Sequence, residues 1–379
     1  MIPVANPHAA YAARRAEING AVQTVLNSGR YILGEQVEAF ERKFAAWSGA
    51  AHCVGCANGT DAIALALHAF GIGGGHAVAV PSFTAVPTVA AIRMVGATPL
   101  LLDVEHDHWT LDPVELAEVL DRPPADLPPI RAVIAVHLYG QPCDLEAIQS
   151  ICRWRGAALI EDCAQAHGAA LGGRKVGLWG DAAAWSFYPT KNLGALGDAG
   201  AVTTSNARIA DAVQRARQYG WDKDRIATGG GWNSRLDEIQ AAVLRVKLRW
   251  LDAAVGRRQE IAARYDVALH PQLRPKVRGE HARHLYVLRH TTDMDLPTPT
   301  QFRTAWRGDL VDFLAGAGVG SAIHYDRAAH QHPAFARCPR GPRDCRVSTD
   351  LASSVLTVPL WPEMDDADVD RVCEALSEL

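Results

Sequence analysis

The chain has 379 residues, of which 48% are apolar and 21% are charged, and its formal net charge is −4. This composition is typical of an ordinary globular protein, and the length predicts a large core divided between two subdomains. The weak negative charge gives no basic surface for nucleic acid. No apolar run reaches membrane-spanning length, and the first residues (MIPVAN) lack the features of a secretion signal. We therefore expect a cytoplasmic protein that contacts neither nucleic acid nor membrane.

Apolar periodicity predicts an N-terminal arm with a helix over 9–26, followed by a helix over 34–47. Short β-rich runs then alternate with helical patterns, which is typical of a mostly parallel sheet with helices on both faces. The predicted strands are 52–57, 77–80, 99–104, 132–138 and 157–162. The predicted helices between them are 61–70, 86–95, 113–120 and 145–155. Ligands of such sheets bind at the carboxyl ends of the strands, where Ser82, His137 and Asp162 stand.

The second half of the chain predicts a smaller region of mixed α+β structure. A helix over 207–219 precedes a long helical pattern over 236–269, which is expected to join two domains. Beyond it, the patterns predict strands over 285–289 and 321–324 and helices over 300–317 and 366–379. We therefore expect a large domain over 1–245 and a small C-terminal domain over 246–379.

The eight cysteines are too few in a chain of this length for a disulfide scaffold. Cys53 and Cys56 form a C-x-x-C pattern, but Cys338 and Cys345 are too far apart to supply a second ligand pair for zinc. We interpret the cysteines as reduced and predict no metal site.

The run from Ser186 to Gly194 (SFYPTKNLG) places one amine, Lys191, among Pro, Gly and apolar residues. Burial there would disfavour the ammonium, and a neutral lysine forms a Schiff base with an aldehyde. Upstream, the predicted strand 157–162 ends in Asp162, 29 residues before Lys191. A Schiff-base lysine and a carboxylate facing a pyridinium nitrogen are the protein's share of pyridoxal phosphate (PLP) chemistry. Taken alone, Lys191 would be interpreted as a lysine on a surface loop, and the upstream strand that ends in Asp162 favours the Schiff base instead.

The run from Asn58 to Asp61 (NGTD) joins a predicted strand to a predicted helix. Gly59 permits a tight turn and Thr60 offers a hydroxyl at the helix start, where free N–H groups bind phosphate. A plain helix cap is the alternative interpretation.

These runs resemble the nucleotide-sugar aminotransferases of the DegT/DnrJ/StrS type, which have the aspartate-aminotransferase fold. The resemblance extends from residues 28–34 (SGRYILG) to residues 358–362 (VPLWP). It implies an α/β fold of the fold type I PLP-dependent transferases, with PLP as the cofactor. It also implies a homodimer whose active sites are shared between the subunits.

The resemblance assigns roles to individual residues. It implies that Lys191 carries PLP and acts as the catalytic base, and that Asp162 keeps the ring nitrogen protonated. The residues that it places around the cofactor are Gly59, Thr60, Asp162, Ala164, Gln165, Ser186, Lys191 and Asn233. Of these, Asn233 would reach the cofactor phosphate of the neighbouring subunit. It places Tyr31, His137, His324 and Tyr325 near the sugar, although each of them also fits a packing residue with a satisfied polar tip.

Two positions depart from the family pattern. Many relatives carry an aromatic residue after the threonine that matches Thr84, where this chain has Ala85, and Phe83 is the candidate replacement. Many relatives have histidine where this chain has Trp361, which would alter the substrate pocket.

The resemblance implies transfer of an amino group from an amino acid, with L-glutamate as the expected donor, to a keto-sugar nucleotide. The GALGD and QYGW runs and residues 236–248 resemble members that act on 3-keto-6-deoxyhexoses, and a 4-keto sugar nucleotide is the alternative. Related PLP-dependent dehydratases carry histidine at the position of Lys191, which argues against dehydration. A regulatory PLP-binding member is a third possibility, but the full set of site residues argues against a degenerate site.

Overall fold

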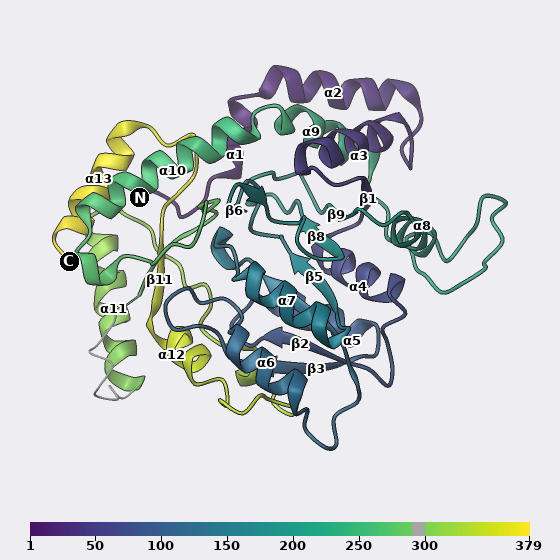
Figure 1. The fold of residues 1–379 in the computed structure, drawn as a ribbon. Helices are drawn as coiled ribbons and strands as arrows, with labels where there is room; N and C mark the ends of the chain where they lie inside the picture. Colours follow the sequence, from purple (N-terminus) through teal and green to yellow (C-terminus); the bar gives the residue numbers. More distant parts are fainter. Residues whose placement is uncertain (290–299) are drawn as a thin grey trace.

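The computed structural model describes residues 1–289 and 300–379 (Figure 1). Its centre is a seven-stranded sheet with the strand order β1-β9-β8-β5-β4-β2-β3. The strands of this sheet are β1 (His52–Cys56), β2 (Ala77–Pro81), β3 (Thr98–Leu102), β4 (Ile130–Val136), β5 (Ala158–Asp162), β8 (Ala182–Ser186) and β9 (Gly200–Thr204). β9 is antiparallel to both of its neighbours, and the other neighbouring pairs are parallel. The predicted mostly parallel mixed sheet is confirmed.

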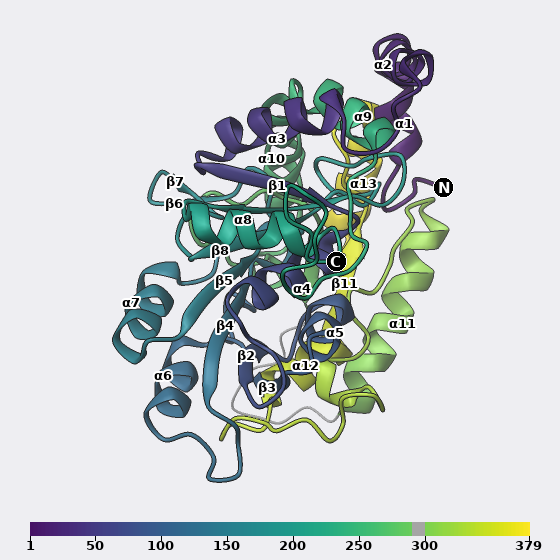
Figure 2. The ribbon, with the colours of Figure 1, turned by 90° about the vertical axis from the view of Figure 1, so that its right-hand side faces the viewer.

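Helices cover both faces of the sheet, and Figure 2 shows α4 and α5 on one side with α6 and α7 on the other. The helices packed on this sheet are α3 (Glu35–Ser48), α4 (Gly59–Ala69), α5 (Val86–Met94), α6 (Pro113–Asp121), α7 (Leu145–Arg155), α8 (Ala207–Ala216) and α9 (Glu238–Leu248). Successive strand residues point to opposite faces, so Val78 and Val80 join the core under α4 while Ala79 joins the core under α7. Because both faces are covered, the strands read as nearly continuous apolar runs.

A separate core lies in the C-terminal part of the chain. It is built by α10 (Leu251–Ala268), β10 (Tyr286–Arg289), α11 (Thr300–Gly316), β11 (Val355–Val358) and α13 (Asp366–Ser377). The N-terminal Ile2 packs into the same core, so the two ends of the chain meet there. The segment around α12 (Arg346–Ser354) packs instead against the large sheet, through Phe335 and Leu351. The domain boundary at 245/246 stays a prediction.

The remaining elements are short or lie on the surface. They are α1 (Pro7–Ala12), α2 (Arg15–Ser28), the hairpin strands β6 (Ala170–Leu171) and β7 (Arg174–Lys175), and three single 3-10 turns, η1 (Leu138–Gly140), η2 (Pro271–Leu273) and η3 (Ala329–Gln331). Within residues 1–289 and 300–379, no helix combines the length and apolar character needed to cross a membrane. No disulfide joins any of the eight cysteines, and the prediction that Cys53 and Cys56 are buried in a strand, β1, is confirmed.

Three predicted elements differ from the structure. The helix over 9–26 is two helices, α1 and α2, and the helix over 236–269 is broken into α9 and α10 at Arg249 and Trp250. The predicted strand 321–324 forms only an isolated bridge, between Ala322 and Thr357. Its neighbour in that bridge belongs to β11, a strand that the sequence analysis missed, as it missed α12.

Candidate active site

Most of the predicted site residues gather at one edge of the sheet, where the parallel strands end. β5 ends at Asp162, β8 ends at Ser186, and β1 leads into α4 through Asn58. A cavity of about 700 Å³ opens at this edge, which is the size of a cofactor or drug-sized ligand site. The predicted residues that line it are Gly59, Thr60, His137, Asp162, Ala164, Gln165, Ser186, Lys191 and Tyr325.

The start of α4 forms one wall of this cavity. The Asn58 side chain caps the helix by accepting a hydrogen bond from the Asp61 N–H at 2.8 Å. The N–H groups of Gly59 and Thr60 precede the first helical hydrogen bond and so have no partner within the helix. Gly59 also lies against β8, because a Cβ added to it would stand 2.6 Å from the Cβ of Ser186. Two free N–H groups and the Ser186 hydroxyl therefore lie close together at this wall, which is the arrangement of donors that binds an anion.

Asp162 is buried on the floor of the cavity. One carboxylate oxygen accepts a hydrogen bond from the Thr88 hydroxyl at 2.8 Å, and the other accepts one from the Ala164 N–H at 3.1 Å. Burial raises the pKa of this carboxyl, while these two donors and Lys191 act in the opposite direction. The two donors fix the orientation of a carboxylate that is costly to keep charged without a cationic partner. Thr88, which the sequence analysis did not identify, is thus the residue that positions Asp162.

Lys191 stands on a tight loop between β8 and β9. The loop is closed by a hydrogen bond from the Ala195 N–H to the Phe187 carbonyl at 2.7 Å, and the Lys191 N–H donates to the Tyr188 carbonyl at 2.8 Å. Burial lowers the pKa of the Lys191 amine to about 8, although the Asp162 carboxylate opposes this shift. The amine therefore loses its proton far more easily than an exposed lysine does.

Gln165 and Tyr325 meet across the cavity from segments far apart in the sequence. The Gln165 amide nitrogen donates to the Tyr325 hydroxyl at 3.0 Å, and its carbonyl oxygen accepts the Tyr139 N–H at 2.6 Å. Gln165 is therefore held at both ends of its amide, and the Tyr325 hydroxyl is directed into the site.

His137 lines the cavity, and both of its ring nitrogens form hydrogen bonds within the protein, so its assignment to the sugar stays a prediction. The Cys143 N–H donates to Nδ1 at 3.1 Å, so this nitrogen carries no proton and the ring is the Nε2–H tautomer. Nε2–H then donates to Glu161 at 3.1 Å, and the whole side chain is buried. Glu161 also accepts backbone N–H bonds from Gly177 and Gly180. His137 and Glu161 thus tie the ends of β4 and β5 together.

The same pair forms, with Cys163, a group of three side chains whose geometry would suit a metal ion. Glu161 already accepts hydrogen bonds from His137 and from backbone N–H groups. Burial raises the pKa of the Cys163 thiol to about 12, which disfavours the thiolate that binds metal.

Three predicted site residues lie outside the cavity of their own chain. The Tyr31 and Asn233 side chains are exposed on the surface, and the Tyr31 hydroxyl donates to the Leu26 carbonyl at 3.3 Å. His324 bonds through Nδ1 to the Thr357 hydroxyl at 2.9 Å and does not line the cavity. The structure of one chain thus brings together most of the predicted residues but not these three.

The two departures from the family pattern have different outcomes. Phe83 is buried in the core and does not line the cavity, so it is no substitute for an aromatic residue at Ala85. Tyr188, which is 53% exposed, lines the cavity, as does Tyr325. Trp361 lines a different and much smaller cavity, on another side of the Lys191 loop.

The described residues fit PLP on structural grounds. The free N–H groups of Gly59 and Thr60 with the Ser186 hydroxyl suit its phosphate, and the space beside Gly59 is one that a Cβ would fill. The buried Asp162 carboxylate, which forms no ion pair with the described residues, suits a protonated ring nitrogen. Lys191, with its lowered pKa, lines the same cavity and suits an aldehyde.

Comparison with known proteins agrees with this reading. Erythromycin biosynthesis sensory transduction protein EryC1 of Saccharopolyspora erythraea is 40% identical, over 99% of this chain and 98% of its own. The dTDP-3-amino-3,4,6-trideoxy-alpha-D-glucose transaminase of Micromonospora megalomicea is 40% identical, over 97% of this chain and 96% of its own. The crystal structure of S. venezuelae DesV in complex with a ketimine intermediate superposes with a TM-score of 0.90 at 37% identity, over 100% of this chain and 98% of the other.

These similarities confirm the expected fold type I architecture and the expected cofactor, PLP. The family model described as the DegT/DnrJ/EryC1/StrS aminotransferase family matches residues 12–377. The chain therefore belongs to the DegT/DnrJ/EryC1/StrS aminotransferase family and is a PLP-dependent aminotransferase.

Proposed function

We propose that this enzyme transfers an amino group from L-glutamate to a nucleotide-linked 3-keto-6-deoxyhexose, in amino-sugar biosynthesis. The observation that carries the proposal is that Lys191, Asp162 and the open start of α4 line one cavity. The transaminase from Micromonospora megalomicea, whose product carries its amino group at C3 of a deoxyhexose, supports the sugar class. A cavity of about 700 Å³ offers room for a sugar beside the cofactor.

The residues of the chain divide the work as follows. When bound, PLP would supply an electron sink for the developing negative charge and would carry the amino group from the donor to the acceptor. The helix start at Gly59 and Thr60, together with Ser186, would bind its phosphate, and Asp162 would hold the proton on its ring nitrogen. Lys191, once freed by the incoming amine, would move the proton between carbon atoms as base and then as acid. Its pKa of about 8 suits both tasks near neutral pH.

The experiment that tests the substrate is a product assay with paired sugars. The enzyme is loaded with PLP and L-glutamate and then offered a dTDP-3-keto-6-deoxyhexose or its 4-keto isomer. We expect rapid amination of the 3-keto sugar, detected as a mass change of the sugar nucleotide, and slow or no amination of the 4-keto isomer. Preference for the 4-keto isomer would overturn the assigned sugar class, and turnover of neither would overturn the sugar assignment.

We also propose that the active unit is a homodimer with shared sites. Tyr31 and Asn233 are exposed, and both lie outside the cavity of their own chain. Apolar side chains close to Tyr31 are exposed as well, since Leu26 is 46% and Ile32 44% exposed. An exposed apolar stretch beside polar residues is typical of a surface that a partner covers. In such a dimer, Asn233 of each chain would complete the phosphate site of the other. The free thiols support a cytoplasmic location.

Mixing two inactive variants tests the shared site. We expect Lys191→Ala and Asn233→Ala homodimers each to have little activity. A dimer that contains one chain of each kind would have one intact site and one doubly defective site. Random reassociation of an equal mixture should restore about one quarter of the wild-type activity. Activity no higher than the mean of the two variants would contradict the sharing of Asn233.

Gly59→Ala tests the phosphate wall. The new Cβ would lie 2.6 Å from the Cβ of Ser186, so the start of α4 must move away from β8. We expect the affinity for PLP to fall by about tenfold or more, which is a change of about 1.4 kcal/mol. Gly20→Ala is the matched control, because nothing lies within 4 Å of the added Cβ there. Equal PLP affinity in the two variants, measured by fluorescence titration of the cofactor-free protein, would contradict the assignment.

The pH dependence of PLP attachment tests the state of Lys191. Only the neutral amine attacks an aldehyde, and its pKa is lowered from 10.5 to about 8. For cofactor-free protein mixed with PLP, we expect the rate of attachment to rise with pH and to reach half its maximum near pH 8. A rate that still rises steeply above pH 10 would show an ordinary, exposed lysine.

A further inference from the structure

The loop that carries Lys191 is held from outside by α9. The Lys247 ammonium donates to the Gly194 carbonyl at 2.7 Å. About two turns closer to the start of α9, the Gln240 side chain accepts a hydrogen bond from the Leu196 N–H at 2.8 Å. Gln240 and Lys247 are seven residues apart, which places them on the same side of the helix. This side of α9 therefore contacts the chain just after Lys191.

Gly194, whose carbonyl accepts the Lys247 hydrogen bond, lies in a tightly closed part of the loop. A Cβ added to Gly194 would lie 2.3 Å from the Pro189 carbonyl oxygen, so the two ends of the turn around Lys191 press against each other. On the other side of the loop, the Asn192 side chain donates to the Ala282 carbonyl at 2.8 Å. Lys191 thus sits on a turn that is fixed by Asn192 on one side and by Lys247 on the other.

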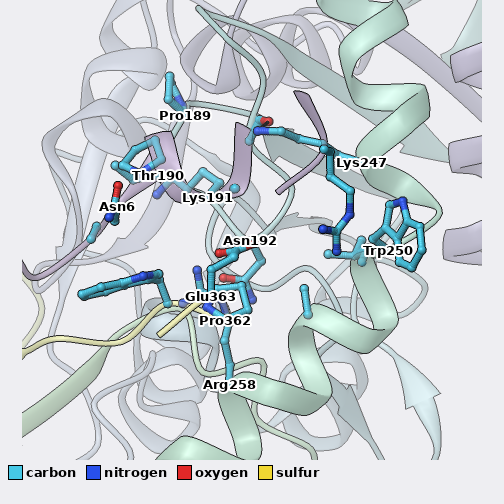
Figure 3. A pocket seen from close by; sticks show the side chains of 18 residues that line it. Asn6, Pro189, Thr190, Lys191, Asn192, Lys247, Trp250, Arg258, Pro362 and Glu363 are labelled. Carbon is cyan, nitrogen blue, oxygen red and sulfur yellow. Dashed lines mark hydrogen bonds between the residues drawn. The ribbon is translucent and has the colours of Figure 1, made fainter. Parts of the chain in front are cut away.

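Lys247 and Lys191 line one small cavity, in which Figure 3 shows Lys247 reaching from its helix toward the segment with Thr190 and Lys191. Its volume of about 70 Å³ holds a few water molecules but no amino acid or sugar. Arg14, Arg258 and Glu363 are the other charged residues that line it.

The protonation of Lys247 does not decide whether it can hold the loop. Burial lowers the pKa of Lys247, and Glu363 opposes this shift. An amine donates an N–H in either protonation state, so the bond to the Gly194 carbonyl persists.

We propose that Lys247 is a positioning residue for the reaction, because its bond to the Gly194 carbonyl aims Lys191 at the aldehyde of PLP. This inference rests on the proposed role of Lys191. Lys247 does not line the large cavity that would hold the cofactor and the substrate. Its removal leaves a buried carbonyl without this donor, and the turn that carries Lys191 is then free to shift. Small displacements of a reacting group are known to cost large factors in rate.

The test follows covalent attachment of PLP to cofactor-free protein by the growth of its visible band. We expect attachment in Lys247→Met, which keeps the apolar stem and removes the donor, to be slower by about 10- to 100-fold. Lys247→Arg retains an N–H donor at similar reach and should restore most of the rate. The KM for the sugar nucleotide should change little in either variant, while kcat falls in Lys247→Met.

Lys175→Met is the matched control, since the Lys175 ammonium also donates to a backbone carbonyl, that of Trp47 at 2.5 Å, but outside the site. Wild-type attachment kinetics in Lys247→Met, or the same loss in Lys175→Met, would overturn the proposal. If Lys247→Met does not fold, Gln240→Leu replaces it, because its contact to the loop is exposed. A Gln240→Leu variant that attaches PLP several-fold more slowly supports the proposal, and wild-type kinetics overturn it.

Loss of the proposed role of Lys191 and loss of the proposed role of Lys247 give different results in this test. If Lys191 is not the attachment site, then Lys191→Ala still shows the visible band, and the proposed function fails. If only the inference about Lys247 is wrong, Lys191→Ala lacks the band and Lys247→Met matches wild type.

Discussion

Lys191→Ala should abolish transamination while leaving the fold intact. The substitution removes the group that attaches PLP and moves the proton, so turnover should fall below detection. The unfolding free energy should change by no more than about 1 kcal/mol, because the side chain forms no ion pair with any residue that the structure describes and its charge is disfavoured by burial. The measurements are turnover with L-glutamate and keto-sugar, and a urea unfolding curve for each protein.

A second readout separates loss of chemistry from loss of cofactor. After reduction with borohydride, wild-type protein should carry PLP covalently on the peptide that contains Lys191. The alanine variant should carry none, although its phosphate wall at Gly59 and Thr60 is unchanged. Retained turnover in Lys191→Ala, or label on another lysine of the wild type, would contradict the assignment.

Asp162→Asn should keep the shape of the site and slow the reaction by about 10²- to 10³-fold, the usual effect of removing one preorganised charge contact. The amide still accepts the Thr88 hydroxyl bond through its oxygen, so the side chain should stay in place. It cannot, however, stabilise a proton on the ring nitrogen, and the carbanionic character that the reaction needs is then poorly supported. PLP should still bind, with reduced affinity.

Thr88→Val is a milder change at the same carboxylate than Asp162→Asn. It removes the 2.8 Å hydrogen bond to Asp162 and keeps the charge. We expect a smaller loss of rate, of about tenfold or less, together with a higher pKa of the Asp162 carboxyl, since a donor that favours the charged form is gone. Both quantities come from pH–rate profiles. An unchanged rate in Asp162→Asn would show that another carboxylate faces the ring.

The sequence predicted the large sheet well because its strands are buried on both faces. Runs such as 77–80 and 132–136 are apolar throughout, and each one precedes a helical pattern. The parallel arrangement then places their ends together, so Asp162, Ser186 and Lys191 could be expected in one place.

The errors fall where the chain gives no local signal. The break between α9 and α10 occurs at Arg249 and Trp250, with neither Gly nor Pro to mark it. β11 follows α12 directly, at Val355, without a turn residue between them. A continuous helical or apolar pattern does not reveal such junctions, because tertiary packing decides them.

Parts of the site depend on contacts between segments that are far apart in the sequence, and the sequence alone does not predict such contacts. The role of Thr88 depends on a hydrogen bond to a residue 74 positions away, and that of Lys247 on a bond to a residue 53 positions away. His137 stands at a strand end, as a ligand residue would, but its ring is taken up by Glu161 and Cys143. The place of His137 in the strand pattern predicted that it lies close to the site. Its hydrogen-bond partners, in contrast, could be seen only in the structure.

The most direct test of the account is the visible absorption of the purified protein with PLP, before and after addition of L-glutamate without sugar. We predict a yellow band of lysine-bound PLP that bleaches to the pyridoxamine form as the amino group is transferred. A band that persists with every amino acid offered would contradict transamination. Absence of the band even with added PLP would contradict the central claim that Lys191 holds the cofactor.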